Sequence, residues 1–456
     1  MKHNAVYLHF VMFRNFYVLR MFKHYLILLT GLIFLFGFNS IKDANIKVSK
    51  NDYNQAKQAF SEMKVALKKE NGKLWNYKLD GGLLLINRES LIIIANEPDE
   101  QGALVKYDDC YAGKFPENMI IANTAVAWNG KRWTMVAFPL PDSKEERLSL
   151  LIHESFHRVQ PLIGFDSMPE IQNIHLDTKD GRTYLKLELE ALKTALHSDN
   201  PEIHIKNALL IRQYRYQLFP EAGNSENSLE LNEGLAEYTG TILSGRSKNE
   251  LEKYYTSKID GFYTSPTFVR SFAYYTIPVY GYFMQQSDYG WNLRSNKHTN
   301  LTDFILDFYH TKRAEISENE IMVIGKLYNI DSIRKFEQNR ELQRLHKIEK
   351  YKVQFLGDSV IKIRLENMSI GFNPSNLMPL DTFGTVYPNL RITDNWGILE
   401  VDSCGALVSS NWNFVTVSYP EMIADSLIRG KGYKLKLNNH WKLVIENGKY
   451  TLTKKY

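Results

Sequence analysis

The chain has 456 residues, of which 44% are hydrophobic and 23% are charged, which is ordinary for a globular protein and enough for two or three domains. The net charge is +5, but four of the excess positive charges stand in the first forty residues, at Lys2, Arg14, Arg20 and Lys23. The remainder is close to neutral and has no basic run with interleaved aromatic residues. We therefore exclude a nucleic-acid partner.

The N-terminal segment has the pattern of an export signal. Lys23 and His24 precede an apolar run of 14 residues, 25–38, which is short for a membrane-spanning helix but typical of a signal-peptide core. A small-x-small cleavage pattern is missing after it. Residues 1–40 are thus predicted to be a signal peptide or an uncleaved N-terminal membrane anchor, and the protein to be exported (periplasmic, at the cell surface or secreted).

Residues 50–71 have helical spacing of apolar side chains and end at Asn71-Gly72. Strand-like runs follow, with Asn129-Gly130 as a strong hairpin signal between the last two. The predicted strands are 82–87, 91–95, 119–122, 125–128 and 133–140.

A second predicted helix begins near Asp142 or Ser143, either of which can cap its first turn. It carries a His-Glu-x-x-His motif. His153 and His157 are one turn apart on one helix face, the separation that two ligands of a tetrahedral zinc ion require. Glu154 can reach a water molecule in the open coordination position. The alternative is an amphipathic helix whose histidines are merely partly buried.

The predicted helix 231–238 supplies a third ligand. Glu233 and Glu237 are again one turn apart, so one carboxylate can bind the metal while the other accepts the second ring N–H of a ligating histidine. The two motifs, His-Glu-x-x-His and Asn-Glu-Gly-x-Ala-Glu-Tyr, resemble those of the gluzincin metallopeptidases, the thermolysin-like and aminopeptidase N-like enzymes.

This resemblance implies specific roles for the motif residues. His153, His157 and Glu233 match the zinc ligands, Glu154 matches the general base, and Glu237 matches the acid that orients a ligating histidine. It also implies a peptide or protein substrate and a sheet strand beside the cleft. Strand 132–139 is the candidate for that edge strand, and a strand filling the core is the equal alternative.

The spacing of the two motifs departs from the best-known gluzincins, because 75 residues lie between His157 and Glu233. Two predicted helices, 182–197 and 201–218, account for the insertion. Other residues of the insertion remain open as the third ligand, namely His175, Glu188 and Glu190.

Helices are also predicted at 251–255, 268–286, 302–310, 317–327 and 331–350. The resemblance implies that a tyrosine or histidine downstream of the third ligand stabilises the oxyanion. Tyr274 and Tyr280 are the candidates, and packing of either tyrosine in the core is the alternative.

From residue 351 the pattern changes to alternating strand-like runs, the first at 352–355, separated by turn residues. Two alternatives are open for Trp396, Trp412 and Trp441: a sugar-binding face or the core. Two others are open for Cys110 and Cys404: a disulfide or two free thiols.

These patterns together predict an α+β fold with three parts. Residues 1–40 are the leader, 41–345 a gluzincin-like catalytic domain with a mixed sheet followed by a helical part, and 346–456 an all-β, sandwich-like accessory domain. The predicted function is a Zn²⁺-dependent peptidase that hydrolyses peptide bonds with a metal-activated water. The alternative is a cell-surface binding protein with an inactive core and a glycan- or protein-binding β domain.

Overall fold

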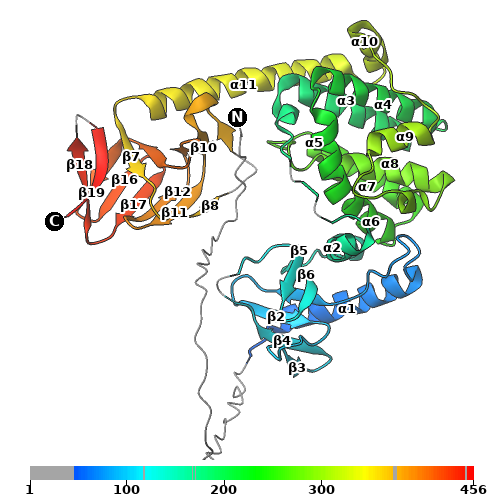
Figure 1. Ribbon diagram of the computed structural model, residues 1–456, viewed down its shortest axis with the longest axis horizontal. Helices are drawn as coiled ribbons and strands as arrows, with labels where there is room; N and C mark the ends of the chain where they lie inside the picture. The colour runs from blue at the N-terminus through cyan, green and yellow to red at the C-terminus, as the bar shows by residue number, and fades with distance from the viewer. Residues whose placement is uncertain are drawn as a thin grey trace, which may run out of the picture. The chain divides into compact units, whose positions relative to one another are not determined.

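The computed structural model describes residues 46–116, 119–166, 168–169, 171–372, 377–446 and 449–455. The predicted leader, 1–40, lies outside the described residues. The described chain has an α+β fold: a mixed sheet comes first, helices fill the middle of the sequence, and β-strands form its C-terminal region (Figure 1). In the part of the chain that the structure describes, no helix is both long and apolar enough to cross a membrane.

The first helix, α1 (Lys50–Glu70), has the predicted bounds to within a residue. The Ser49 side chain accepts a hydrogen bond from the backbone N–H of Asp52 and so caps its start. The helix ends at Asn71, which adopts the left-handed conformation that asparagine tolerates better than most residues.

A six-stranded sheet follows α1, with the strand order β3-β4-β2-β1-β6-β5. Strands β1 and β6 pair in parallel and the other neighbours are antiparallel, so the sheet is mixed as predicted. The strands are β1 (Leu83–Ile86), β2 (Ile92–Ala95), β3 (Val105–Tyr107), β4 (Cys110–Lys114), β5 (Thr124–Trp128) and β6 (Lys131–Ala137).

One predicted strand is absent, since no strand forms at 119–122. For strand 132–139, a cleft edge and the core were equal alternatives. It corresponds to β6, which is flanked by β1 and β5 and therefore fills the core. The strand at the edge of the sheet is β5, the other half of the Asn129-Gly130 hairpin.

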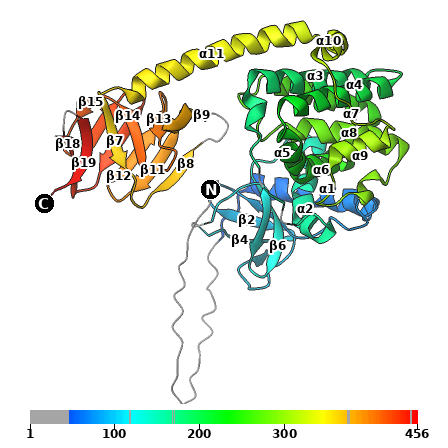
Figure 2. The ribbon, with the colours of Figure 1, turned by 45° about the horizontal axis from the view of Figure 1, so that its top comes forward.

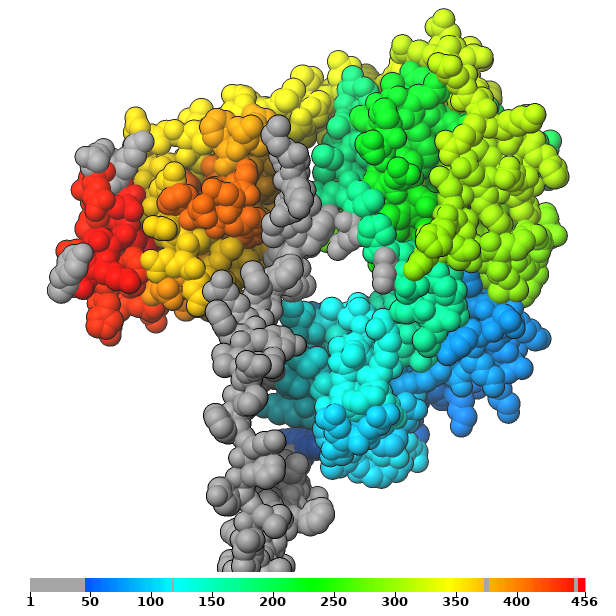
Figure 3. All heavy atoms as spheres, in the orientation of Figure 1, coloured from blue at the N-terminus to red at the C-terminus, as the bar shows by residue number. Residues whose placement is uncertain are grey.

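Helix α2 (Lys144–Val159) joins the sheet to the helical region. Ser143 caps it by accepting from the backbone N–H of Glu146. Leu148, Leu151 and Ile152 belong to the core shared with the sheet, whereas Phe156 belongs to the core of the helical region. Figure 2 shows α2 between β6 and the helices that follow. In the space-filling view, the cyan atoms of the strands lie against the blue-green atoms of α2 (Figure 3).

The middle of the chain is helical and has one large apolar core. The predicted helix 201–218 coincides with α4, and each of the other predicted helices falls on an observed one with shifted ends. The helices are α3 (Lys179–Leu196), α4 (Pro201–Leu218), α5 (Ala222–Leu229), η3 (Glu230–Gly234), α6 (Leu235–Leu243), α7 (Lys248–Phe262), α8 (Ala273–Ser287), α9 (Leu301–Phe308) and α10 (Glu318–Lys326). Short 3₁₀ turns are η1 (Gln160–Ile163), η2 (Ile174–Asp177) and η4 (Trp291–Arg294).

Among the described residues, the longest helix is α11 (Ile330–Leu356). Its first half is tied to α3 because the buried Glu337 carboxylate pairs with Arg182 at 3.0 Å and with Lys186 at 2.6 Å. The helix continues through 352–355, so the strand predicted there is wrong. The predicted domain boundary between residues 345 and 346 falls inside this helix.

The C-terminal region consists of two sheets that contribute to one apolar core. Trp396 and Trp441 are buried in that core and Trp412 packs against it, so the three tryptophans do not form a shared sugar-binding face. Cys110 and Cys404 are free thiols, so the disulfide alternative is excluded.

The first C-terminal sheet has the order β18-β19-β7-β14-β13-β10-β9 and the second has the order β15-β16-β17-β12-β11-β8. The strand bounds are β7 (Val360–Arg364), β8 (Ser369–Phe372), β9 (Met378–Pro379), β10 (Thr385–Tyr387), β11 (Leu390–Asp394), β12 (Gly397–Val401), β13 (Ala406–Val408), β14 (Phe414–Ser418), β15 (Pro420–Ile423), β16 (Leu427–Gly430), β17 (Tyr433–Leu437), β18 (Trp441–Glu446) and β19 (Lys449–Lys454). A 3₁₀ turn, η6 (Asp381–Phe383), lies between β9 and β10.

Candidate metal centre

Three side chains from two helical segments converge on one point. The Nε2 atoms of His153 and His157 on α2 are 3.1 Å apart. Glu233 on η3 places its Oε2 atom 3.4 Å from the first nitrogen and 3.3 Å from the second. The three residues that the two sequence motifs predict to bind a metal therefore have one atom each within 3.4 Å of the other two.

The donor set fits a divalent metal ion. An ion about 2.0–2.1 Å from each of three tetrahedral ligands would separate the ligand atoms by roughly 3.3–3.4 Å, close to the observed edges. Two imidazoles and a carboxylate are also the ligand types that first-row metals prefer. Among the described residues, no other group of three His, Cys, Asp or Glu side chains could hold a metal ion.

The carboxylates of Glu233 and Glu237 favour positive charge at the cluster. Glu237 Oε2 lies 3.0 Å from His153 Nδ1, and its Oε1 accepts from the Tyr254 hydroxyl at 3.4 Å. Burial opposes charge on His153, but hydrogen bonds to Glu233 and Glu237 outweigh it and raise the pKa of the imidazole to about 10. A bound cation would satisfy the same carboxylates.

The segment that carries Glu233 is a π-helical turn, η3, between α5 and α6. Such turns are rare and frequently lie at functional sites. The Leu235 backbone N–H bonds to Glu230 O, five residues back, instead of to Leu231 O.

The close approach of α6 to α2 depends on Gly240, since a Cβ there would lie 2.4 Å from Ser149 O.

A glutamine that the sequence analysis missed supports the second histidine. Gln160 follows α2 directly and is 4% exposed. Its Oε1 lies 2.9 Å from His157 Nδ1, and its Nε2 donates to the backbone carbonyls of Leu231 and Asn232. The available signal was its position three residues after His157, on the same helix face.

Glu154 is adjacent to the candidate ligands but does not belong to their cluster. It lines the same cleft, is 6% exposed, and its Oε2 atom is buried without a hydrogen-bond partner. Burial raises the pKa of this carboxyl, His153 and His157 oppose the rise, and Glu233 adds to it. A buried carboxylate with a free oxygen and a raised pKa has the properties of a general base.

The structure separates the two candidate tyrosines. Tyr274 lines the cleft, donates from its hydroxyl to Glu233 Oε2 at 2.5 Å, and stacks parallel to the His153 ring. Burial raises its pKa and Glu233 raises it further, so the phenol keeps its proton and remains a donor. Tyr280 is fully buried elsewhere and donates to Glu188. Tyr280 therefore does not belong to the site.

The rival third ligands are also elsewhere. Glu188 is paired with two arginines, His175 Nε2 lies 2.7 Å from a Glu226 oxygen, and Glu190 accepts from Lys193. None of the three belongs to the ligand cluster.

A fully buried ionic network supports the π-helical turn. Arg212 donates to Glu188 and, through two nitrogens, to Glu230. Arg215 donates to the other oxygen of Glu188 and, through two nitrogens, to Glu226. All five side chains have 0% exposure. Since Glu230 is the first residue of η3, the network fixes the segment three residues before Glu233.

The cluster opens into a cavity of about 420 Å³. One wall is the edge of the sheet, where Thr124 and Ala125 of β5 line the cavity beside Asn123. An edge strand has unpaired backbone N–H and C=O groups that can pair with an extended chain. The remaining lining residues are Arg132, His153, Glu154, His157, Gln160, Pro161, Phe165, Met168, Asn232, Glu233 and Tyr274.

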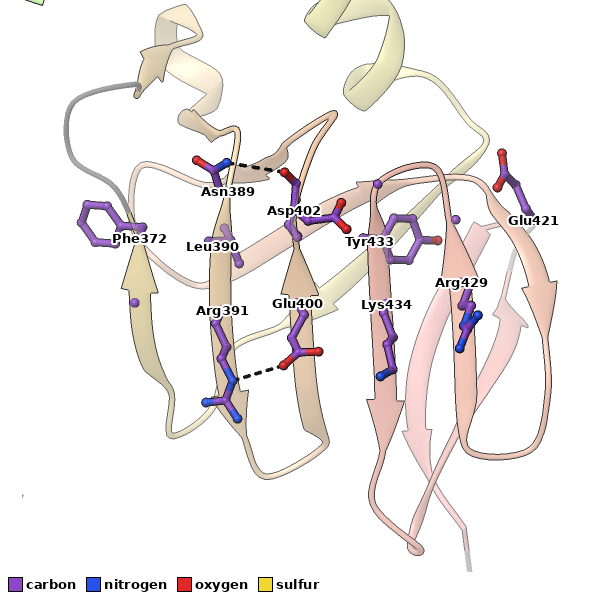
Figure 4. A pocket seen from close by; sticks show the side chains of 14 residues that line it. Phe372, Asn389, Leu390, Arg391, Glu400, Asp402, Glu421, Arg429, Tyr433 and Lys434 are labelled. Carbon is purple, nitrogen blue, oxygen red and sulfur yellow. Dashed lines mark hydrogen bonds and ion pairs between the residues drawn. The ribbon is translucent and has the colours of Figure 1, made fainter. Parts of the chain in front are cut away.

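A second hollow, of about 910 Å³, lies on the exposed face of the second C-terminal sheet (Figure 4). Arg391, Glu400, Lys434 and Arg429 occupy one cross-strand row on β11, β12, β17 and β16, and Arg391 donates to Glu400 at 3.4 Å. This alternation of exposed charges is typical of the solvated face of an antiparallel sheet. The exposed row contains no aromatic platform for a sugar.

No family model, no curated protein and no solved structure matches the chain. The function is therefore inferred from the chemistry of the site and from the resemblance of the two motifs.

Proposed function

We propose that the protein is a zinc-dependent peptidase of gluzincin type, with His153, His157 and Glu233 as the metal ligands. The observation that carries the proposal is the triangle of their ligand atoms, with edges of 3.1, 3.3 and 3.4 Å, next to the unpartnered Oε2 of Glu154. Two histidines and one carboxylate that leave a position open are the ligand set of a catalytic, not a structural, zinc site.

When bound, zinc would polarise the carbonyl of the scissile bond and lower the pKa of a coordinated water to about 7. Glu154 takes a proton from the attacking water as the water oxygen bonds to the carbonyl carbon. It passes that proton to the amine nitrogen as the C–N bond breaks. Its buried, unshared oxygen is suited to both transfers.

The Tyr274 hydroxyl is the candidate donor for the carbonyl oxygen as that oxygen gains negative charge. Its hydrogen bond to Glu233 holds the phenol at the edge of the ligand cluster, and the rings of Tyr274 and His153 differ by only 4° in orientation. A hydroxyl that keeps its proton can stabilise the oxyanion without any proton transfer.

The edge of β5 supports a peptide as the substrate. An extended peptide laid against Thr124 and Ala125 would form backbone hydrogen bonds and lie beside Glu154 and the ligands, since all of these residues line one cavity. An isolated small ester or amide would leave that strand edge unused.

Glu154→Gln separates the peptidase from the alternative, a binding protein with an inactive core. We expect wild-type protein loaded with zinc to cleave members of a peptide library, scored by mass spectrometry. The variant should lose activity by about 10²–10⁴-fold while it keeps its metal. Glu145→Gln, in the first turn of the same helix, is the control and should cleave normally. Equal cleavage by wild type and Glu154→Gln would contradict the assignment of the base.

A further inference from the structure

A single amide, that of Gln160, bonds both to a proposed ligand and to the turn that carries another one. Gln160 directly follows the last residue of α2 and is the first residue of the 3₁₀ turn η1, in which Pro161 comes next. Its side chain points back along the helix to His157 and across to η3.

The π-helical turn releases one of the two carbonyls to which this amide donates, that of Leu231. In an α-helix the Leu235 N–H would bond to Leu231 O, but here it bonds to Glu230 O. Leu231 O instead accepts from Gln160 Nε2 at 3.2 Å, and Asn232 O accepts from the same nitrogen at 3.1 Å. Carbonyl oxygens only accept hydrogen bonds, so the nitrogen of the amide must face them.

The orientation of the amide then decides the proton position on His157. With Nε2 of Gln160 turned to the carbonyls, its Oε1 faces His157 Nδ1 at 2.9 Å. That oxygen is an acceptor, so Nδ1 of His157 carries the hydrogen. When the ring is neutral, the lone pair is therefore left on Nε2, the atom that faces His153 Nε2 and Glu233 Oε2.

We propose that Gln160 is a positioning residue that holds His157 in the metal-binding tautomer and couples this tautomer to the π-helical turn that presents Glu233. Its acceptor atom acts on the ligand and its donor atom acts on the turn. The role in metal binding rests on the proposed function, whereas the tautomer is a property of the metal-free protein.

Two substitutions separate the acceptor from the donor. Gln160→Glu keeps an oxygen for His157 but loses the amide donor that bonds to the two carbonyls, whereas Gln160→Met is similar in size and loses both contacts. Gln213→Met is the matched control. Gln213 is also a buried glutamine, its Nε2 donates to Leu209 O, and its Oε1 accepts from the Ala314 N–H, but it does not contact the ligand cluster.

The test is ¹⁵N NMR of histidine-labelled, metal-free, full-length protein at alkaline pH, with His157 assigned by comparison with His157→Gln. We expect His157 to be protonated at Nδ1 in wild type, in Gln160→Glu and in Gln213→Met. In Gln160→Met it should become a mixture of tautomers. Protonation at Nε2 in wild type would overturn the inference, as would an unchanged tautomer in Gln160→Met.

Zinc affinity, measured by chelator competition, provides the second readout. Gln160→Met should bind zinc about 10–100-fold more weakly than wild type, the range typical for loss of such a partner. Gln160→Glu should bind at least as tightly as wild type but melt at a lower temperature, because the two carbonyls lose their donor. Gln213→Met should lose thermal stability without losing affinity.

Failure of the proposed function has a different signature. If wild type binds no zinc but shows the predicted tautomers, the metal site is wrong and the role of Gln160 stands. Should Gln160→Met fail to fold, the tautomer of wild-type His157 still decides the question. Equal zinc affinity in folded Gln160→Met and wild type would overturn the role in metal binding, and an unchanged melting temperature in Gln160→Glu would overturn the coupling to the turn.

Discussion

The ligand cluster and the residues around it have separable roles, because each contact to Glu233 comes from a different residue. Glu233 offers Oε2 to the two histidines and accepts from Tyr274 on the same oxygen, while its Oε1 accepts from Asn232. Substituting a neighbour of this carboxylate therefore changes one contact at a time, and conservative variants can assign the roles.

Tyrosine-to-phenylalanine variants test the oxyanion donor. We expect Tyr274→Phe to lower kcat by about 10²–10³-fold with zinc content unchanged, because it removes one donor and no ligand. Tyr280→Phe is the matched control, since its hydroxyl bonds to buried Glu188 and not to the site. Steady-state kinetics on a peptide substrate, normalised to zinc content, distinguish them. Equal losses in the two variants would contradict the role of Tyr274.

The sequence predicted the residues of the cluster better than their partners. His153, Glu154, His157 and Glu233 stand in motifs whose spacing carries chemical meaning. Gln160 has no such motif, and its role depends on two backbone carbonyls more than seventy residues further along the chain. Tyr274 and Tyr280 could not be separated, because which side of α8 meets the cluster depends on how that helix packs.

Among the elements, the π-helical turn and the ionic network beneath it determine where Glu233 lies. Thr276 on α8 donates to Glu230 at 2.6 Å, and Arg212 donates to both oxygens of the same carboxylate. Paired buried charges contribute little net stability relative to apolar residues, but removal of one partner leaves a charge without compensation. The network should therefore respond strongly to single substitutions.

Arginine-to-methionine variants test this sensitivity. Arg212→Met should lower the free energy of unfolding by about 3–5 kcal/mol, because it leaves Glu188 and Glu230 undercompensated. Arg313→Met is the control, since Arg313 pairs with Asp303 in an exposed ion pair that should contribute no more than about 1 kcal/mol. Denaturant unfolding followed by circular dichroism measures both. A similar loss of unfolding free energy in both variants would show that burial does not govern how much an ion pair contributes to stability.

Acid should destabilise the same network through Glu226. Burial opposes charge on this carboxylate, but Arg215 and the hydrogen bond from His175 outweigh it and hold its pKa at about 2, below the ordinary value of 4.5. The stabilisation is present above pH 4.5 and is lost as the pH falls toward 2. The free energy of unfolding of wild type should fall across this window, and that of Glu226→Gln should fall less steeply. An equally steep fall of the unfolding free energy with pH in wild type and Glu226→Gln would contradict the assignment of this pH dependence to Glu226.

Helical periodicity predicted α1, α2 and α4 closely, because their apolar spacing and end residues agree. It could not predict η3, since a π-helical turn differs from an α-helix in hydrogen bonding and not in composition. Residues 352–355 were predicted to form a strand but are helical, because a short apolar run next to a helix fits the helical period as well as the strand period. Whether strand 132–139 lies at the edge or in the core depended on the pairing of β6 with β1, which is a tertiary contact.

In the whole molecule, the site combines segments that are distant in the sequence. The proposed ligands come from α2 and η3, the proposed donor from α8 and the candidate substrate edge from β5. The 75 residues between His157 and Glu233 contain α3 and α4, which pack against each other and carry part of the buried network. The inserted helices thus carry part of the ionic network that contacts η3, whereas the proposed ligands lie on the two motif segments.

Zinc per chain, measured by elemental analysis on the full-length protein, tests the central claim most directly. Wild type should hold one zinc ion per chain, Glu233→Ala should lose it or bind it weakly, and Glu190→Ala, which removes a rival carboxylate, should retain it. Absence of zinc from wild type after zinc is added would contradict the metal centre and with it the peptidase. Full retention of zinc in Glu233→Ala would contradict the third ligand.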